Sequence, residues 1–412
     1  MKISIFTPSH NPKWLAKAYE SLIAQTYGNW EWVVLLNNGA GWGYDNLDSR
    51  VRIVYDDSDI KGVGELKSKA AELCDGEILL ELDHDDVLMP TALEKVAQAF
   101  ADNPDVGFVF SDFAQMNEDG TPNLTEFDPS YGWSYYQDGD WKVVRAKSAH
   151  PHNVAYIWYA PNHLRAFRKS AYESAGGYNQ DLEILDDQDL MARLYLVTKF
   201  LPIHENLYLQ RIHGSQTQAD PILNPKIQEE TVRMYDRNIQ SLVLKWAKDN
   251  GLHALDLGGA HNPAPGFTTV DQHDADITGD IFDVLGNLKD NSVGVIRACD
   301  FIEHISDKIR LWNEMYRVLA DGGMVLSLTP STDGRGAFQD PTHVAYYNQN
   351  SFWYFIDENY RRYVPELKVN FQSSRLMTFF PSAFHQNNNI PYVLANLVAL
   401  KGEERYGGRL GA

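Results

Sequence analysis

The chain has 412 residues, of which 44% are hydrophobic and 12% aromatic, and a net charge of -20. This length fits two globular domains with packed interiors better than one. The acidic balance excludes a general binder of nucleic acid or anionic membranes, because phosphate attraction needs a basic surface, but it permits a local site for a phosphorylated small molecule.

The cysteines and the N-terminus set the expected compartment. Cys74 and Cys299 lie far apart in sequence without metal-ligand spacing, so neither a disulfide framework nor a zinc site is supported. The start "MKISIFTPSHN" has a short apolar run broken by Pro8, which is neither a signal peptide nor an anchor. Because no window approaches about 18 consecutive apolar residues, we expect no transmembrane segment and a cytoplasmic protein.

The first half of the chain alternates strand and helix patterns. Strands are predicted at 2–8, 30–38, 50–57 and 77–83, and helices at 12–26 and 64–74. Strands separated by helices predict a mainly parallel sheet, in which ligands bind beyond the carboxyl ends of the strands.

The middle of the chain is irregular and aromatic from Phe127 to Phe167, and we expect a lid or side wall there. Helical patterns return at 181–197 and, after two prolines, at 226–251, where Gly251 is a plausible stop. A second series of strands and helices follows from residue 253 and includes a helix predicted at 307–323. The predicted fold class is therefore α/β with two doubly wound domains. We place the domains at 1–225 and 251–400, with a helical linker at 226–250 and a flexible tail at 401–412.

Three aspartates follow the strand predicted at 77–83: Asp83, Asp85 and Asp86. Alternation along an extended segment lets Asp83 and Asp85 project to one side, with Asp86 turned away. Two converging carboxylates suit Mg²⁺ or Mn²⁺, which typically bridges protein carboxylates to substrate phosphates. From this short motif alone, a solvated turn followed by a helix at Pro90 is the more frequent explanation.

Four ordered segments resemble the family 2 glycosyltransferases of the GT-A fold: "SIFTPSHN", "GELKSKAAELCDGEILLELDHDD", "ESAGGYNQDLEILDDQDLMARL" and "LQRIHGSQT". The resemblance implies a nucleotide-diphospho-sugar donor and a glycan or other hydroxyl acceptor. It also implies that Asp85 ligates the metal while Asp83 holds the ribose or shares the metal shell. Lys67 would lie near the diphosphate, and Thr7 and Pro8 would line the nucleoside pocket.

The same resemblance implies that Asp187 is the catalytic base of an inverting transfer, which takes a proton from the acceptor hydroxyl. The alternative is that Asp186, Asp187 and Asp189 are acids favoured at a helix N-terminus. His213 would complete the metal shell and Arg211 would pair with phosphate oxygens, although a lone histidine is more often structural.

Two positions depart from the family pattern. Relatives usually carry aspartate where this chain has "LLNNG", and there the carboxylate accepts a hydrogen bond from uracil. Asn38 can accept one through its amide oxygen without charge assistance, so selectivity for UDP is less secure. The acidic motif also begins with Asp186 instead of the commoner glutamate.

The second half resembles class I methyltransferases, through "DITGDIFDVLGNLKDNSVGVIRACDFIEHI", "EMYRVLADGGMVLSLTP" and "DPTHVAYYNQNSF". For an S-adenosylmethionine site, this places Gly258 under the methionine part, Asp271 on the ribose and Asp280 near the adenine. Glu303 and His304 would close the pocket, and His343 either faces a methyl acceptor or is structural. The usual Gly-x-Gly is absent after Gly258, so a fold retained without activity stays open.

The leading prediction is a metal-dependent glycosyltransferase joined to a methyltransferase-like domain that methylates the glycan. One alternative is a methyltransferase whose N-terminal half only binds carbohydrate. The other is a glycosyltransferase whose C-terminal half is an inactive docking module.

Overall fold

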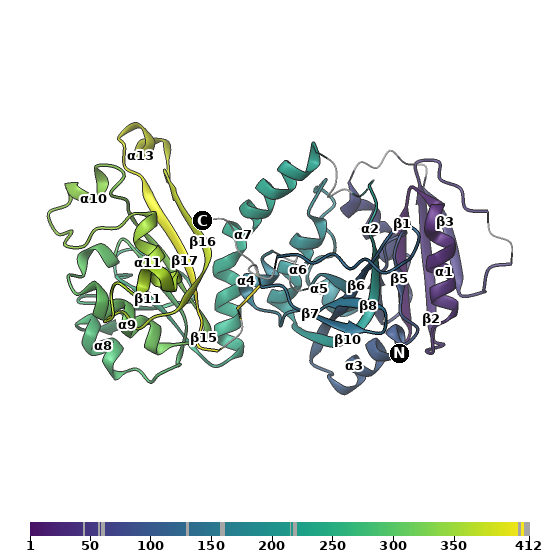
Figure 1. Ribbon diagram of the computed structural model, residues 1–412, viewed down its shortest axis with the longest axis horizontal. Coiled ribbons are helices and arrows are strands. Elements are labelled where there is room, and N and C mark those ends of the chain that lie inside the picture. The colour runs from purple at the N-terminus through teal and green to yellow at the C-terminus, as the bar shows by residue number, and fades with distance from the viewer. Residues whose placement is uncertain are drawn as a thin grey trace. The chain divides into compact units, whose positions relative to one another are not determined.

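The computed structural model describes residues 1–412 except 44–45, 57, 59–61, 129–131, 157–160, 215, 217–220, 403–404 and 408–412. The chain divides into two compact units, Met1–Asn238 and Ile239–Ala412. The division falls within helix α7 (Leu223–Asp249), in the segment for which we propose a helical linker. Part of the proposed tail at 401–412 lies outside the described residues. Figure 1 shows the elements of both units.

The first unit is built on a sheet whose strands are β1 (Ile3–Ser9), β2 (Trp30–Asn37), β3 (Val51–Asp56), β4 (Ile78–Glu81), β5 (Val87–Leu88), β6 (Val106–Met116), β7 (Tyr135–Asp138), β8 (Trp141–Val144), β9 (His163–Arg168) and β10 (Lys199–Arg211). Their order is β3-β2-β1-β4-β9-β6-β10-β5, with β8 also on β6 and β7 on β8. Strands β1 to β4 are parallel, so their carboxyl ends share one edge.

Helices surround this sheet: η1 (Pro12–Trp14), α1 (Leu15–Ile23), α2 (Val63–Glu72), α3 (Ala92–Asp102), α4 (Pro151–Val154), α5 (Lys169–Ser174) and α6 (Asp186–Val197). Strand β1 shows that both faces are covered, since Ile5 packs in the core that holds α1 and α3, and Phe6 in the core that holds α2 and α6. Such two-sided burial explains why β1 and β2 are almost continuously apolar.

The second unit has strands β11 (His253–Leu257), β12 (Thr268–Asp271), β13 (Ile277–Thr278), β14 (Val293–Cys299), β15 (Leu319–Pro330), β16 (Phe371–Phe379) and β17 (Tyr392–Ala399). Their order is β13-β12-β11-β14-β15-β17-β16. The first five are parallel, and β17 and β16 add an antiparallel edge.

Its helices are α8 (Ile281–Asn287), η4 (Ile302–His304), α9 (Lys308–Val318), α10 (Gly336–Gln339), η5 (Gln349–Phe352), α11 (Trp353–Ile356), α12 (Glu358–Arg361) and α13 (Ala383–Asn387). Helix α9 carries an apolar stripe that is fully buried in the core, with Leu311, Trp312 and Met315 at its centre. Among the described residues of either unit, no helix combines the length and apolarity needed to span a membrane.

The predicted α/β class with two doubly wound sheets is confirmed. Two predictions about elements were wrong. The segment expected to be irregular ends in β9, which lies in the middle of the sheet between β4 and β6 because Leu164, Ala166 and Phe167 are fully buried. The helix predicted at 307–323 stops at Val318, and β15 takes over at Leu319.

Candidate functional site

The aspartate cluster lies just beyond β4, where the chain turns before β5. The Asp86 side chain points inward, is 2% exposed, and accepts hydrogen bonds from the Arg211 backbone N–H and the Tyr208 hydroxyl, both at 2.7 Å. Burial, with the neighbouring charges of Asp85 and Asp83, raises its pKa well above the usual range. Asp86 is thus an internal partner of β10, while Asp83 and Asp85 remain partly exposed.

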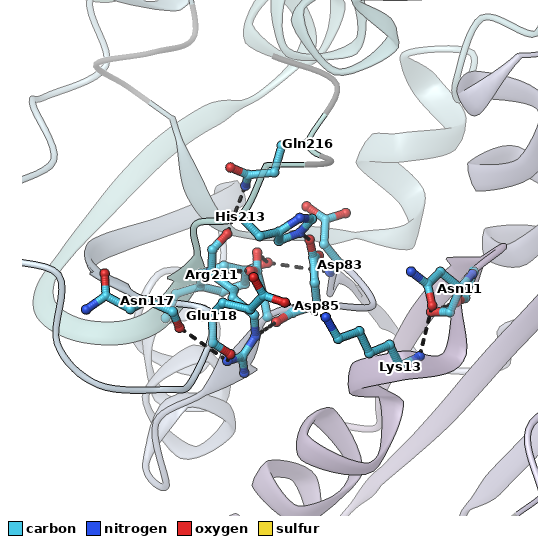
Figure 2. Close-up of polar contacts among 12 residues, drawn as sticks. Asn11, Lys13, Asp83, Asp85, Asn117, Glu118, Arg211, His213 and Gln216 are labelled. Carbon is cyan, nitrogen blue, oxygen red and sulfur yellow. Dashed lines mark hydrogen bonds and ion pairs between the residues drawn. The ribbon is translucent and has the colours of Figure 1, made fainter. Parts of the chain in front are cut away.

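The side chains of Asp85 and His213 contact each other (Figure 2), because the end of β10 lies against the turn that follows β4. The His213 Nε2 lies 2.7 Å from the Asp85 Oδ2. The Arg211 Nε donates to the Asp85 backbone carbonyl at 2.8 Å. The Trp14 ring packs on His213 with centroids 4.6 Å apart. An acid and an imidazole held in this way are both suitable ligands for a divalent ion.

Asp83 has acidic neighbours whose negative charges oppose its own ionisation. Burial raises its pKa to about 7, with Glu81 and Asp85 adding to the effect and Lys67 opposing it. A carboxyl group in that position ionises fully only when positive charge is supplied. The donor set therefore fits a dication. Among the described residues, however, the ligand atoms of Asp83, Asp85 and His213 do not all lie within 4.8 Å of one another.

Lys67 lies in a buried ionic network beneath this turn. Its Nζ is 2.6 Å from the Glu81 Oε1 and 3.1 Å from the Asp186 Oδ2, and the side chain is 8% exposed. Burial alone would lower the pKa of Lys67, but Asp186 and Glu81 outweigh it and raise the pKa. The ammonium group thus forms ion pairs with two carboxylates of the same unit.

Asp187 lies in the first turn of helix α6 and contacts Arg165. Its Oδ2 lies 3.0 Å from the Arg165 Nη1, its Oδ1 accepts from the Gln188 backbone N–H at 2.8 Å, and its side chain is 31% exposed. Burial opposes its ionisation, but Arg165 and Lys67 outweigh burial and lower the pKa of Asp187. Asp187 is therefore an ionised, partly accessible carboxylate at neutral pH.

The residues predicted for the nucleoside pocket lie at the carboxyl ends of β1 and β2: Thr7 and Pro8 are in β1, and Asn38 directly follows β2. Thr7 is fully buried, and its hydroxyl donates to the Leu82 carbonyl at 2.7 Å and accepts from the Trp32 indole at 2.9 Å. Pro8 is half-buried beside it. Asn38 is exposed, with a left-handed φ of 55° at the end of β2. Pro8 and Asn38 are therefore accessible at the sheet edge, whereas the Thr7 side chain joins β1 to the end of β4.

Several residues of the site were not predicted. Arg165 binds Asp187, and Tyr178 donates to the Glu81 Oε2 at 2.9 Å. Arg165 belongs to β9, so the signal was the run "HLRAFR" inside an aromatic segment, which places Arg165 on the same side as His163. Tyr178 follows the two glycines of "SAGGY", where no periodic pattern points to a buried hydroxyl.

In the second unit, Gly258 and Asp271 end the neighbouring strands β11 and β12. Gly258 has a φ of 75°, and a Cβ there would lie 2.8 Å from the Phe301 ring, so only glycine fits. The Ala260 N–H donates to the Asp271 Oδ2 at 3.4 Å, so the carboxylate faces the glycine turn. Asp280 instead caps helix α8 by accepting from the Phe282 N–H at 2.8 Å.

Comparisons with known proteins agree with this architecture. The model described as "Glycosyl transferase family 2" matches residues 4–173, and that of a "Methyltransferase domain" matches residues 253–327. An uncharacterised protein of Sinorhizobium fredii is 27% identical over 46% of this chain and 20% of its own length. A chondroitin synthase of Escherichia coli is 25% identical over 52% of this chain and 29% of its own.

An uncharacterised glycosyltransferase of Haemophilus influenzae is 25% identical over 53% of this chain and 70% of its own length. The chain thus spans less than a third of the first two relatives and most of the third. In sequence, residues 4–173 thus match a family 2 glycosyltransferase domain and residues 253–327 match a methyltransferase domain, and in topology each unit has a doubly wound sheet.

Proposed function

We propose that the protein is a metal-dependent, inverting glycosyltransferase that moves a sugar from a nucleotide-diphospho-sugar, with UDP-sugars as first candidates, to a hydroxyl of a glycan or similar acceptor. The observation that carries this proposal is Asp85 held 2.7 Å from His213 beside Asp83, whose pKa burial raises to about 7. Carboxylates that lie close together at the carboxyl edge of a parallel sheet are stabilised by a dication that also binds a diphosphate.

Asp85, His213 and Asp83 are the residues that would hold Mn²⁺ or Mg²⁺. Such an ion, when bound, supplies positive charge to the leaving diphosphate. Arg211 already donates to the backbone carbonyls of Asp85 and Glu118, so fewer of its N–H groups remain to bind phosphate. Arg211 and the buried Lys67 would then act on a bound phosphate mainly indirectly. They would hold the residues around the phosphate in place, and their positive charges would add to the electrostatic potential there.

Asp187 would accept the proton of the acceptor hydroxyl. Its lowered pKa keeps it ionised, and Arg165 fixes its orientation through the 3.0 Å contact. Arg165 and Lys67 both interact with Asp187 and with Asp83. These two cations lie within electrostatic range of the proposed base and of the proposed metal site, which supports a shared reaction centre.

The test is nucleotide release from a panel of UDP-sugars with Mn²⁺, measured for the full chain and for Asp85→Asn. The expected result is slow donor hydrolysis that needs Mn²⁺ and is lost in Asp85→Asn. Asp140→Asn, at an exposed turn between β7 and β8, is the matched control and should keep the activity. Release that persists without metal, or that Asp85→Asn leaves unchanged, would refute the assignment of the metal site.

For the second unit we propose S-adenosylmethionine binding at the ends of β11 and β12, with methylation of the glycan or a related acceptor. The obligate glycine at 258 and the Asp271 carboxylate that faces the same turn favour it. Micromolar S-adenosylmethionine binding by calorimetry is expected. An absence of binding would favour a docking module instead. The two cysteines carry free thiols, which suits the proposed cytoplasmic setting.

A further inference from the structure

Three side chains of the second unit gather where β14 and β15 end. Glu303 and His304 belong to η4, which follows β14, and His343 belongs to the loop after α10. Each offers one ligand atom, and these atoms all lie within 4.8 Å of one another. In the described part of the chain this is the one group of three such side chains that meets this distance. The His304 and His343 rings are 4.9 Å apart.

Both imidazoles have Nδ1 within hydrogen-bond distance of a partner, and the His343 Nε2 lies 4.0 Å from the Asp340 Oδ2, beyond hydrogen-bond distance. The His343 Nδ1 lies 2.9 Å from the Ala337 carbonyl, to which it must donate. The His304 Nδ1 lies 3.1 Å from the Thr342 hydroxyl, and that hydroxyl donates to the Asp340 Oδ1 at 2.6 Å. Thr342 therefore accepts from His304. Each ring then carries its proton on Nδ1 and leaves the Nε2 lone pair for another partner.

Glu303 supplies an unpaired carboxylate oxygen. The side chain is 2% exposed, and its Oε2 accepts from the Thr329 hydroxyl at 2.9 Å. Its Oε1 is buried and has no hydrogen-bond partner among the described residues. An unpartnered oxygen of a buried carboxyl group is costly unless a positive group binds it.

The backbone fixes the geometry of the three residues. The N–H groups of Val344 and Ala345 both donate to the Glu303 carbonyl at 2.9 Å. The loop that carries His343 is therefore attached directly to the turn that carries Glu303 and His304. Such pre-organisation is what metal sites require of the residues behind the ligands.

We propose that Glu303, His304 and His343 form a binding site for a divalent transition metal ion, with Zn²⁺ as the best match. Two neutral imidazoles and one carboxylate are a recognised zinc donor set, and three protein ligands leave a coordination position open. Imidazole also selects against Mg²⁺ and Ca²⁺. His304 is exposed, so the ion and an oxygen ligand on its open position can arrive from solvent. The site involves no cysteine, and cysteine spacing gave no sign of it.

The test measures Co²⁺ and Zn²⁺ binding to the full chain in an Asp85→Asn background, which removes the proposed metal ligand of the first unit. We expect one equivalent of Co²⁺ with visible absorption bands typical of nitrogen ligation, displaced by Zn²⁺. His304→Ala should abolish the bands. Thr342→Val should weaken Zn²⁺ binding on the order of 10-fold, because it only orients His304.

Two further variants make the outcome decisive. Glu303→Gln keeps the shape of a buried side chain and should also lose the ion, with circular dichroism reporting that the fold is retained. His273→Ala removes an exposed histidine of the same unit and should leave binding unchanged. Should His304→Ala and Glu303→Gln, both folded, bind Co²⁺ as the background protein does, the three residues are structural and the proposal is overturned.

Discussion

Both units place potential metal ligands beyond the carboxyl ends of parallel strands. The two ligand sets differ in their proportion of carboxylates and imidazoles. In the first unit, Asp83 and Asp85 crowd together, and the His213 Nε2 already contacts a carboxylate. In the second, His304 and His343 have fixed tautomers and one buried carboxylate between them. Oxygen-rich, negatively charged sites favour Mn²⁺ or Mg²⁺, whereas two imidazoles favour Zn²⁺. If both proposals hold, one fold class supports two sites for different ions.

The largest expected effect lies on the chemical step in the first unit. Asp187→Asn removes the proposed base while keeping the size of the side chain, and we expect kcat for transfer to fall by about 10² to 10⁴-fold. Binding of the donor, measured by calorimetry, should change little. A fall in donor affinity with kcat preserved would instead make Asp187 a residue of the donor site.

The next prediction concerns how much the buried ionic network of the first unit contributes to stability. Lys67→Met leaves Glu81 and Asp186 without their shared cation, and the loss of one partner of a buried pair costs about 3–5 kcal/mol. Chemical denaturation of the full chain should show this loss in one transition. Lys226→Met, at an exposed ion pair with Glu183, should shift the free energy of unfolding by less than about 1 kcal/mol.

The pH dependence of stability sharpens the same contrast. The pKa of Asp83 is about 7 in the folded protein and near 3.8 when unperturbed. Because the folded state holds this proton more tightly, the residue opposes folding increasingly as pH rises from about 4 to about 7, by at most about 1.4 kcal/mol per pH unit. Asp83→Asn should remove this slope from metal-free unfolding curves, and Mn²⁺ should flatten it in the unmodified protein. Identical slopes in both proteins would contradict the proposed charge crowding.

The smallest effect concerns nucleotide selectivity. Asn38→Asp adds charge assistance to a hydrogen bond with uracil, and UDP should bind tighter by about 1 kcal/mol, roughly fivefold. GDP binding serves as the control and should not improve. Equal affinities for UDP before and after the change would place Asn38 outside the base pocket.

The sequence predicted most of the fold because strands β1 to β4 and helices α1 and α2 have unambiguous periodicity and sit next to one another along the chain. It missed β9, since the short alternating run "HLRAFR" lies inside a segment whose other aromatic residues follow no strand period. Arg165 was missed with it, and so was the pairing that fixes Asp187. The partners of His304 and His343 depend on contacts with Thr342 and Ala337, so spacing alone could not reveal their tautomers.

The central claim is that a bound dication allows Asp83 and Asp85 to lie beside a nucleotide diphosphate at the carboxyl edge of the first sheet. Calorimetry of UDP binding with and without Mn²⁺, in the unmodified protein and in Asp85→Ala, tests it most directly. The account predicts Mn²⁺-dependent binding that disappears in Asp85→Ala while Asp140→Ala keeps it. Binding of UDP that is indifferent to Mn²⁺, or to the loss of Asp85, would contradict the account.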